Sequence, residues 1–174
     1  DVCAPSIANQ WRTFKSFLPC MKVLYLVHSM SPLTGWGRMA HELVAGCREL
    51  GIEVDVLSEK SSGFPGEKAV LKKSWRALLS VGVVRKQLIN GRYDIVHSLE
   101  VNPYGVIGHL ASLGLPVRHV ISATGAYSVR PLYQFATSFI VSSAYKAASA
   151  VLCISQYIQD EILKKVFLNN IRVI

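Results

Sequence analysis

The chain contains 174 residues, of which 51% are hydrophobic and 17% are charged, a composition that excludes an intrinsically disordered protein. This length corresponds to about one domain with enough apolar material for a sizeable core. The 19 lysines and arginines exceed the 11 aspartates and glutamates, and the net charge of +8 favours anionic partners such as nucleotide phosphates, nucleic acid or an acidic membrane surface.

The first 20 residues differ from the rest because they lack hydrophobic periodicity, whereas Met21 directly precedes the apolar run KVLYLV. We expect residues 1–20 to be a non-native or disordered upstream segment and residues 21–174 to form the domain. A genuine extension, or the interior of a longer chain, is the alternative. No transmembrane helix is expected, since the least charged stretch, residues 131–159, is typical of a buried helix followed by a buried strand.

Apolar runs of strand length alternate with helical patterns along the remainder of the chain. Strands are predicted at residues 22–27, 53–57, 94–97, 117–122, 151–154 and 171–174. Helices are predicted at residues 38–50, stopped by Gly51, from an Asn102 cap and Pro103 to Gly114, and at 156–167 after a Ser155 cap. This alternation predicts an α/β fold with a Rossmann-like, doubly wound parallel sheet, whose ligands bind beyond the carboxyl ends of the strands.

The loop after the first predicted strand, residues 28–38, is the first candidate binding segment. Gly35 and Gly37 flank Trp36 directly before a helix, where a close backbone approach and unpaired amides suit a phosphate. Gly35, Gly37 and Ala40 also match G-x-G-x-x-A, and Glu59 lies where a dinucleotide fingerprint places its ribose-binding acid. An NAD-linked oxidoreductase domain is therefore an alternative, as is an ordinary glycine turn.

The end of the third predicted strand carries polar side chains towards the same edge of the sheet. His97, Ser98, Glu100 and Asn102 follow one another there, and Glu100 or His97 could orient an acceptor hydroxyl or take its proton. A core histidine and a simple helix cap at Asn102 are the alternatives.

Residues 123–131 follow the fourth predicted strand and face the same edge. Tyr127 offers a stacking surface and Arg130 a phosphate partner. A glycine turn with an exposed arginine is the alternative.

A basic segment follows the second predicted strand. Its cations are Lys68, Lys72, Lys73, Arg76, Arg85, Lys86 and Arg92. Lys72, Lys73 and Arg76 would share one helical face beside Trp75, which suits an anionic membrane surface. A solvated helix face is the alternative, and nucleic acid is not expected because no recognised binding motif accompanies the charge.

Metal and nucleophilic chemistry are not indicated. The cysteines are Cys3, Cys20, Cys47 and Cys153, and no pair has the spacing of metal ligands or of a disulfide framework. Neither G-x-S-x-G nor H-E-x-x-H occurs. We therefore expect no metal and a reducing, cytoplasmic compartment.

The order of these segments resembles the N-terminal half of a GT-B glycosyltransferase of the retaining family 4. The motifs that carry the resemblance are KVLYLVHS, TGWGRMAHELVAGCRELGIEVDVLS, YDIVHS, ISATGAYSVRPL, ASAVLCISQYIQDEIL and IRVI. The resemblance covers Met21 to Ile174 and implies retaining transfer of a sugar from a UDP- or GDP-linked donor to a sugar or lipid-linked acceptor. No cofactor other than this donor substrate is implied.

The resemblance also implies roles for individual residues. The family's glycine loop near the donor phosphates corresponds to Gly35, Trp36 and Gly37. Its His-Gly element corresponds to Thr124-Gly125, so threonine stands where histidine is common, and no histidine-based role is carried over. The acceptor side would be lined by Glu100, Asn102, Thr124, Gly125 and Tyr127.

Two further expectations concern the whole protein. Family members often dock on membranes through basic helices of this half, so Lys72, Lys73, Trp75 and Arg76 are predicted to face the inner membrane surface. Family enzymes are roughly twice this length and bind most of the donor with a second domain. The chain is therefore expected to be a fragment that is inactive alone, and a purely membrane-binding module is a further alternative.

Overall fold

A computed structural model describes residues 21–72 and 74–174, and for residues 74 and 75 only the backbone. The expectations for residues 1–20 and for Lys73, together with the side chain of Trp75, lie outside this description. Seven parallel strands form one sheet in the order β3-β2-β1-β4-β5-β6-β7. Because β1 lies inside the sheet and the chain then winds outwards in both directions, the predicted Rossmann-like, doubly wound fold is confirmed.

Six of the strands match the six predicted apolar runs. They are β1 (Lys22–Ser29), β2 (Glu53–Lys60), β4 (Ile95–Leu99), β5 (Arg118–Ala123), β6 (Ala150–Cys153) and β7 (Ile171–Val173). The seventh, β3 (Glu67–Ala69), was not predicted. It is a short, largely exposed edge strand that pairs with Val56–Ser58 of β2, so its own residues carry no apolar pattern.

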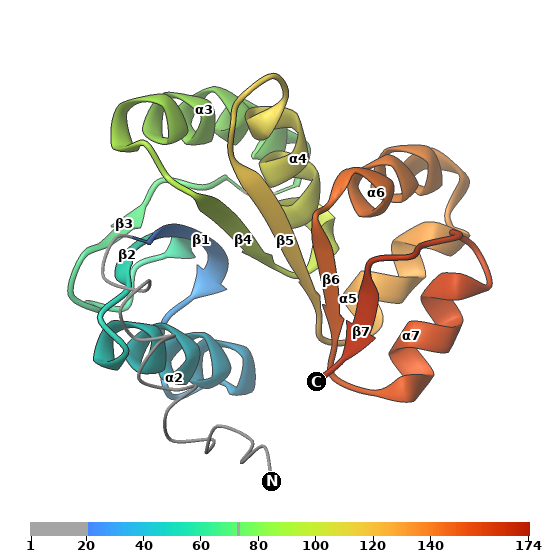
Figure 1. The fold of residues 1–174 in the computed structure, drawn as a ribbon, viewed down its shortest axis with the longest axis horizontal. Coiled ribbons are helices and arrows are strands. Elements are labelled where there is room, and N and C mark those ends of the chain that lie inside the picture. Colours follow the sequence, from blue (N-terminus) through green and yellow to red (C-terminus); the bar gives the residue numbers. More distant parts are fainter. Residues whose placement is uncertain (1–20, 73) are drawn as a thin grey trace, which may run out of the picture.

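Helices cover both faces of the sheet. Figure 1 shows α3 (Leu79–Gly91), α4 (Val106–Ser112) and α6 (Phe135–Ala147) on one side, with α2 (Gly35–Glu49) on the other. The short α5 (Ala126–Val129) and α7 (Gln156–Leu163) lie at the β6–β7 end. In β1, Leu24 and Leu26 pack towards the α3 side and Val23, Tyr25 and Val27 towards α2. This double burial explains why the strand sequences are nearly continuously apolar.

Helix boundaries agree with the sequence where side-chain caps set them. The Ser155 hydroxyl accepts a hydrogen bond from the Ile158 amide and begins α7, as predicted. Gly51 follows α2 with φ +82°, the left-handed conformation expected of a helix stop. Helix α2 begins at Gly35 rather than Arg38, because Thr34 caps it three residues earlier.

Two predicted helices are wrong in detail. Asn102 does not cap a helix: the Asn102–Pro103 peptide bond is cis, residues Val101–Gly105 form a π-helical turn (η3), and α4 begins at Val106. The basic segment is not one helix either. It contains β3, a connecting stretch, the 3-10 helix η2 (Ser74–Leu78) and only then α3. Its cations are consequently spread over several elements.

Candidate functional site: a cleft at the carboxyl ends of the strands

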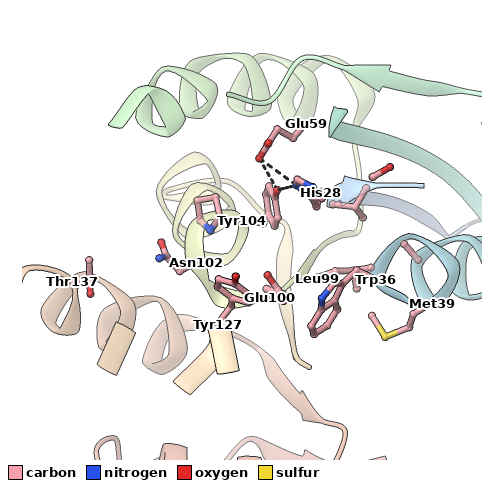
Figure 2. A pocket seen from close by; sticks show the side chains of 14 residues that line it. His28, Trp36, Met39, Glu59, Leu99, Glu100, Asn102, Tyr104, Tyr127 and Thr137 are labelled. Carbon is pink, nitrogen blue, oxygen red and sulfur yellow. Dashed lines mark hydrogen bonds and ion pairs between the residues drawn. The ribbon is translucent and has the colours of Figure 1, made fainter. Parts of the chain in front are cut away.

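A cleft of about 690 Å³ opens at the carboxyl ends of β1, β2 and β4. Its 14 lining residues come from the ends of these strands and from the N-terminal parts of α2, η3, α5 and α6 (Figure 2). They are Val27, His28, Ser29, Trp36, Met39, Ala40, Glu59, Leu99, Glu100, Asn102, Pro103, Tyr104, Tyr127 and Thr137. Parallel strands deliver their polar carboxyl-terminal residues to one edge, so the position follows from the topology.

The N-terminus of α2 forms one rim of the cleft. Thr34 is its cap, and the Thr34 hydroxyl accepts a hydrogen bond from the Gly37 amide at 3.1 Å. A Cβ on Gly37 would lie 2.1 Å from the carbonyl oxygen of Ser31, whereas one on Gly35 would meet nothing within 4 Å. Gly37 is therefore needed for close packing, and the amides available to an anion in this first turn are those of Gly35 and Trp36.

The Trp36 ring links this rim to the loop after β5. A Cβ built on Gly125 would lie 2.9 Å from the ring, so the absence of a side chain at Gly125 makes room for the indole. The turn at residues 35–37 and the loop at residues 124–127 thus lie against one another, as predicted. Trp36 is 39% exposed and Tyr127 60% exposed, and both line the cleft.

A hydrogen-bonded cluster of His28, Glu59 and Tyr104 forms the side of the cleft at β1 and β2 (Figure 2). The Tyr104 hydroxyl donates to Glu59 Oε2 at 3.0 Å. His28 Nδ1 lies 3.2 Å from the Tyr104 oxygen and 3.4 Å from Glu59 Oε2. The Glu59 side chain is 8% exposed, so two donors stabilise a nearly buried carboxylate.

Glu100 occupies the centre of the β4 end in an unusual conformation. Its φ of +83° and ψ of 149° fall in a region that is essentially restricted to glycine. Its Oε1 is buried and has no hydrogen-bond partner among the described residues. Burial raises the pKa of its carboxyl group to about 7. A strained backbone that holds an unpartnered carboxyl group in a cleft is a physical sign of a functional position.

The predicted acceptor-side residues divide into two groups. Glu100, Asn102 and Tyr127 line the cleft, while Thr124 and Gly125 do not. Thr124 is only 4% exposed, and its buried hydroxyl has no partner among the described residues. Of the predicted donor-side residues, Trp36 lines the cleft, whereas Gly35 and Gly37, in the same turn of α2, do not.

His97 does not reach the cleft, so the alternative of a core histidine is confirmed. Its Nε2 lies 2.8 Å from the Ser122 hydroxyl, its ring stacks at 4.9 Å on Tyr25, and burial lowers its pKa to about 4. Sequence reasoning assigned no role to His28 and Tyr104, although His28 stands at a strand's carboxyl end, the position where ligands are expected.

The dinucleotide interpretation finds little support in this geometry. Five residues separate the end of β1 at Ser29 from Gly35, and the Gly37 amide is already bonded to Thr34. Glu59 lies at the end of β2 as that interpretation requires, but its carboxylate accepts hydrogen bonds from within the protein.

The basic segment has a mixed surface. Lys72, Arg76 and Lys86 are exposed, beside Leu79 at 66% and Val83 at 44% exposure. Arg85 instead donates to the carbonyl oxygens of Ala111 and Leu113 and ties α3 to the end of α4.

The described residues offer neither a metal centre nor a membrane-spanning helix. They contain no cluster of three or more metal-ligating side chains. No helix among them combines the length and apolarity required to cross a membrane.

Solved structures with this fold include a glycosyltransferase, a UDP complex and a UDP-GlcNAc 2-epimerase. The Anabaena protein HepE in complex with UDP aligns with a TM-score of 0.69 at 18% identity, over 88% of this chain and 43% of HepE. A glycosyltransferase from Rickettsia africae aligns with a TM-score of 0.59 at 17% identity, over 88% and 42%. The UDP-GlcNAc 2-epimerase of Methanocaldococcus jannaschii aligns with a TM-score of 0.62 at 11% identity, over 88% and 45%.

These identities establish the fold alone, and the chain spans less than half the length of each of these structures. No curated protein matches the sequence. The family model of Glycosyltransferase Family 4 does match it, over residues 33–174, which include the α2 turn, the cleft residues Glu59, Glu100 and Tyr127, and β7. With this match and a GT-B-type fold, the chain belongs to Glycosyltransferase Family 4.

Proposed function

We propose that the chain is the N-terminal, acceptor-side domain of a retaining glycosyltransferase that transfers a sugar from a UDP- or GDP-linked donor. The observation that carries the proposal is the meeting of Trp36, Glu100 and Tyr127 around one cleft at the carboxyl edge of the sheet, with Gly125 packed against the Trp36 ring. HepE, of the same fold, binds UDP, and this supports a nucleotide-linked donor.

In this proposal the donor phosphates lie over the first turn of α2. The Gly35 and Trp36 amides point along the helix axis and donate to phosphate oxygens, and the helix dipole adds a favourable field. As the donor's glycosidic bond breaks, negative charge develops on the leaving phosphate, and fixed amide dipoles stabilise this charge without reorganising. The acceptor occupies the cleft beside Glu100, Asn102 and Tyr127, with Thr124 and Gly125 supporting the wall behind it.

Gly35 allows a direct test of the phosphate contact. Proline is tolerated at the first position of a helix, and Thr34 has the extended conformation (φ −118°, ψ 147°) that a residue before proline prefers. Gly35→Pro therefore removes one amide donor without disrupting α2, and Gly35→Ala is the matched control that keeps it. We expect UDP to shift the Trp36 indole resonance of the wild-type protein and of Gly35→Ala.

Gly35→Pro should weaken UDP binding by about tenfold or more, since a hydrogen bond to a charged group contributes roughly 1.5–3 kcal/mol. UDP binding that is equally tight in both variants would remove the phosphate role of this turn.

We further propose that the isolated chain does not transfer sugar, because a donor held from one side only is neither oriented nor shielded from water. Incubation of the chain with radiolabelled UDP-sugars and simple glycoside acceptors should therefore give no labelled product. Transfer by the purified chain would contradict this part of the proposal. In any preparation that does transfer sugar, the anomeric proton signals of the product would distinguish retention from inversion.

We also propose that the start of α3 docks on an anionic membrane, which would bring a lipid-linked acceptor to the cleft. The exposed Leu79 and Val83 would enter the interface while the cations Lys72, Arg76 and Lys86 meet the lipid phosphates. Lys73 and the Trp75 side chain, predicted from the sequence for the same surface, lie outside the described part of the structure.

Co-sedimentation with vesicles should show binding to phosphatidylcholine–phosphatidylglycerol mixtures at low salt and little binding to phosphatidylcholine alone. Leu79→Asp should abolish binding. Phe167→Asp, a control at an 81% exposed position after α7, should not. Binding that ignores both lipid charge and salt would exclude this surface.

A further inference from the structure

The charge of the cleft is opposite to the charge of the protein. The chain carries a net charge of +8, yet among the described residues that line the cleft two are glutamates and none is a lysine or an arginine. Glu59 and Glu100 lie on either side of Tyr104 (Figure 2). Two carboxylates with low-dielectric walls focus a negative potential into the space between them.

The hydrogen-bond directions in the His28 cluster can be assigned from chemistry alone. The single hydroxyl proton of Tyr104 is donated to Glu59, and a carboxylate can only accept. The two atoms near His28 Nδ1, at 3.2 and 3.4 Å, are therefore both acceptors, so Nδ1 must carry a hydrogen. In the neutral ring this leaves Nε2 with a lone pair, so His28, which lines the cleft, keeps an acceptor atom that these two contacts do not use.

Glu100 contributes a second unoccupied acceptor. Its Oε1 has no partner among the residues that the structure describes, although burial makes an unpaired carboxylate oxygen costly. A ligand that supplies hydrogen-bond donors would relieve this cost. A ligand that supplies only acceptors, such as a phosphate or carboxylate group, would increase it.

The opposite wall is suited to the face of a ring. Trp36 and Met39 from α2 and Leu99 from β4 provide an apolar surface, on which the C–H face of a sugar can pack. The cleft therefore combines an aromatic platform with hydrogen-bond acceptors from the ends of β1, β2 and β4, and Asn102 adds one side chain that both donates and accepts.

We propose that this cleft selects an uncharged, hydroxyl-bearing sugar ring as the acceptor and rejects rings that carry a phosphate or carboxylate near the reacting hydroxyl. The sugar hydroxyls donate to Glu59, Glu100 and His28 Nε2 while the ring packs on Trp36. The proposal rests on the proposed function only in naming the occupant an acceptor. The charge preference itself is a property of the cleft.

Matched pairs of sugars test this preference in the 174-residue chain. Methyl α-D-glucopyranoside is compared with methyl α-D-glucuronide, methyl α-D-galactopyranoside with methyl α-D-galacturonide, and methyl α-D-mannopyranoside with its own 6-phosphate. The readout is the Trp36 indole N–H resonance of ¹⁵N-labelled protein, assigned with Trp36→Phe. At pH 8, which is above the pKa of about 7 of the Glu100 carboxyl group, the neutral member of at least one pair should bind about tenfold or more tightly than its anionic partner.

Three variants locate the origin of the preference. Glu59→Gln and Glu100→Gln should each reduce the ratio between neutral and anionic affinities severalfold. Glu49→Gln makes the same charge change at the exposed far end of α2, about 20 Å along the helix from Trp36, and should leave the ratio unchanged. Glu100→Gln keeps the test informative if loss of the Tyr104 bond unfolds Glu59→Gln.

Two results would overturn the proposal: anionic members binding as tightly as their neutral partners, or no sugar in any pair shifting the Trp36 resonance. Neither result bears on the α2 phosphate contact, which the UDP experiment measures separately. Conversely, a clear charge preference with no UDP binding would leave this inference standing while the proposed donor site fails.

Discussion

Replacing Glu100 with glutamine should stabilise the fold, and the gain should depend on pH in a defined way. Glu100 is the cleft residue that combines a positive φ, a buried oxygen without a partner among the described residues, and a raised pKa. Glutamine has nearly the same shape and carries no charge at any pH. The substitution therefore removes the ionisation of Glu100 while leaving the packing of the cleft almost unchanged.

The magnitude follows from the pKa. The carboxyl group of Glu100 has an ordinary pKa of 4.5 and a pKa of about 7 in the folded protein. At 1.36 kcal/mol per pH unit, ionising it costs the folded state at most about 3 kcal/mol. Between these two values the folded state holds a proton that the unfolded state has lost. The contribution of Glu100 to wild-type stability therefore falls as the pH rises from 4.5 to 7 and is level above that window.

Thermal unfolding followed by circular dichroism measures this difference directly. Below pH 4.5 the wild-type protein and Glu100→Gln should melt together, and above pH 7 the variant should melt higher by about 6–12 °C, at 2–4 °C per kcal/mol for a chain of this size. Glu49→Gln, at an exposed position, is the control and should show a small difference that does not depend on pH.

A second substitution separates charge from backbone strain. Glu100→Gly removes the charge and also relieves the φ of +83°, a strain of roughly 1–3 kcal/mol that glutamine retains. It should therefore melt higher than the wild-type protein even at pH 4.5. The raised pKa, and the reasoning built on it, would be refuted if the melting temperatures of the wild-type protein and Glu100→Gln differed by the same amount at every pH from 4.5 to 8.

Three further predictions concern neighbouring parts of the structure. Gly37→Ala should lower the melting temperature by about 4–8 °C, for a cost of about 2 kcal/mol, because its Cβ meets the Ser31 carbonyl. The control Gly35→Ala should be neutral or slightly stabilising, and equal melting temperatures of the two variants would contradict this packing. His97→Asn should lose less stability than the wild-type protein between pH 6.5 and 4, since the buried imidazole resists a proton that the unfolded state accepts; acid titrations of equal slope would argue against it. Gly125→Ala should shift tryptophan emission by displacing the ring beside it, an effect that should vanish in a Trp36→Phe background.

Much of the architecture could be predicted from local patterns. The six apolar strands, the Ser155 cap and the Gly51 stop each depend on residues close together in the chain. The edge strand β3 could not be predicted in this way. It has three residues, and it is a strand only because β2 offers an unpaired edge beside it.

The basic segment shows how a local pattern can mislead. Its alternation of cations and apolar residues is typical of an amphipathic helix, yet pairing with β2 takes Lys68 into a strand and leaves Lys72 in the connection before η2. Tertiary hydrogen bonds outweighed a helical preference that amounts to tenths of a kcal/mol per residue.

The site divides along the same line. The residues that end strands, Glu100 among them, could be expected at the cleft from the alternation of strands and helices alone, because parallel strands present their carboxyl ends at one edge. The bonds from Tyr104 to Glu59, across 45 positions, and to His28, across 76, arise only when the sheet order places β1 between β2 and β4. The sequence alone determined which side chains reach the carboxyl edge of the sheet, since that depends on local periodicity. The tertiary structure decided which of these side chains meet and what charge surrounds a ligand, since both depend on distances that no local pattern encodes.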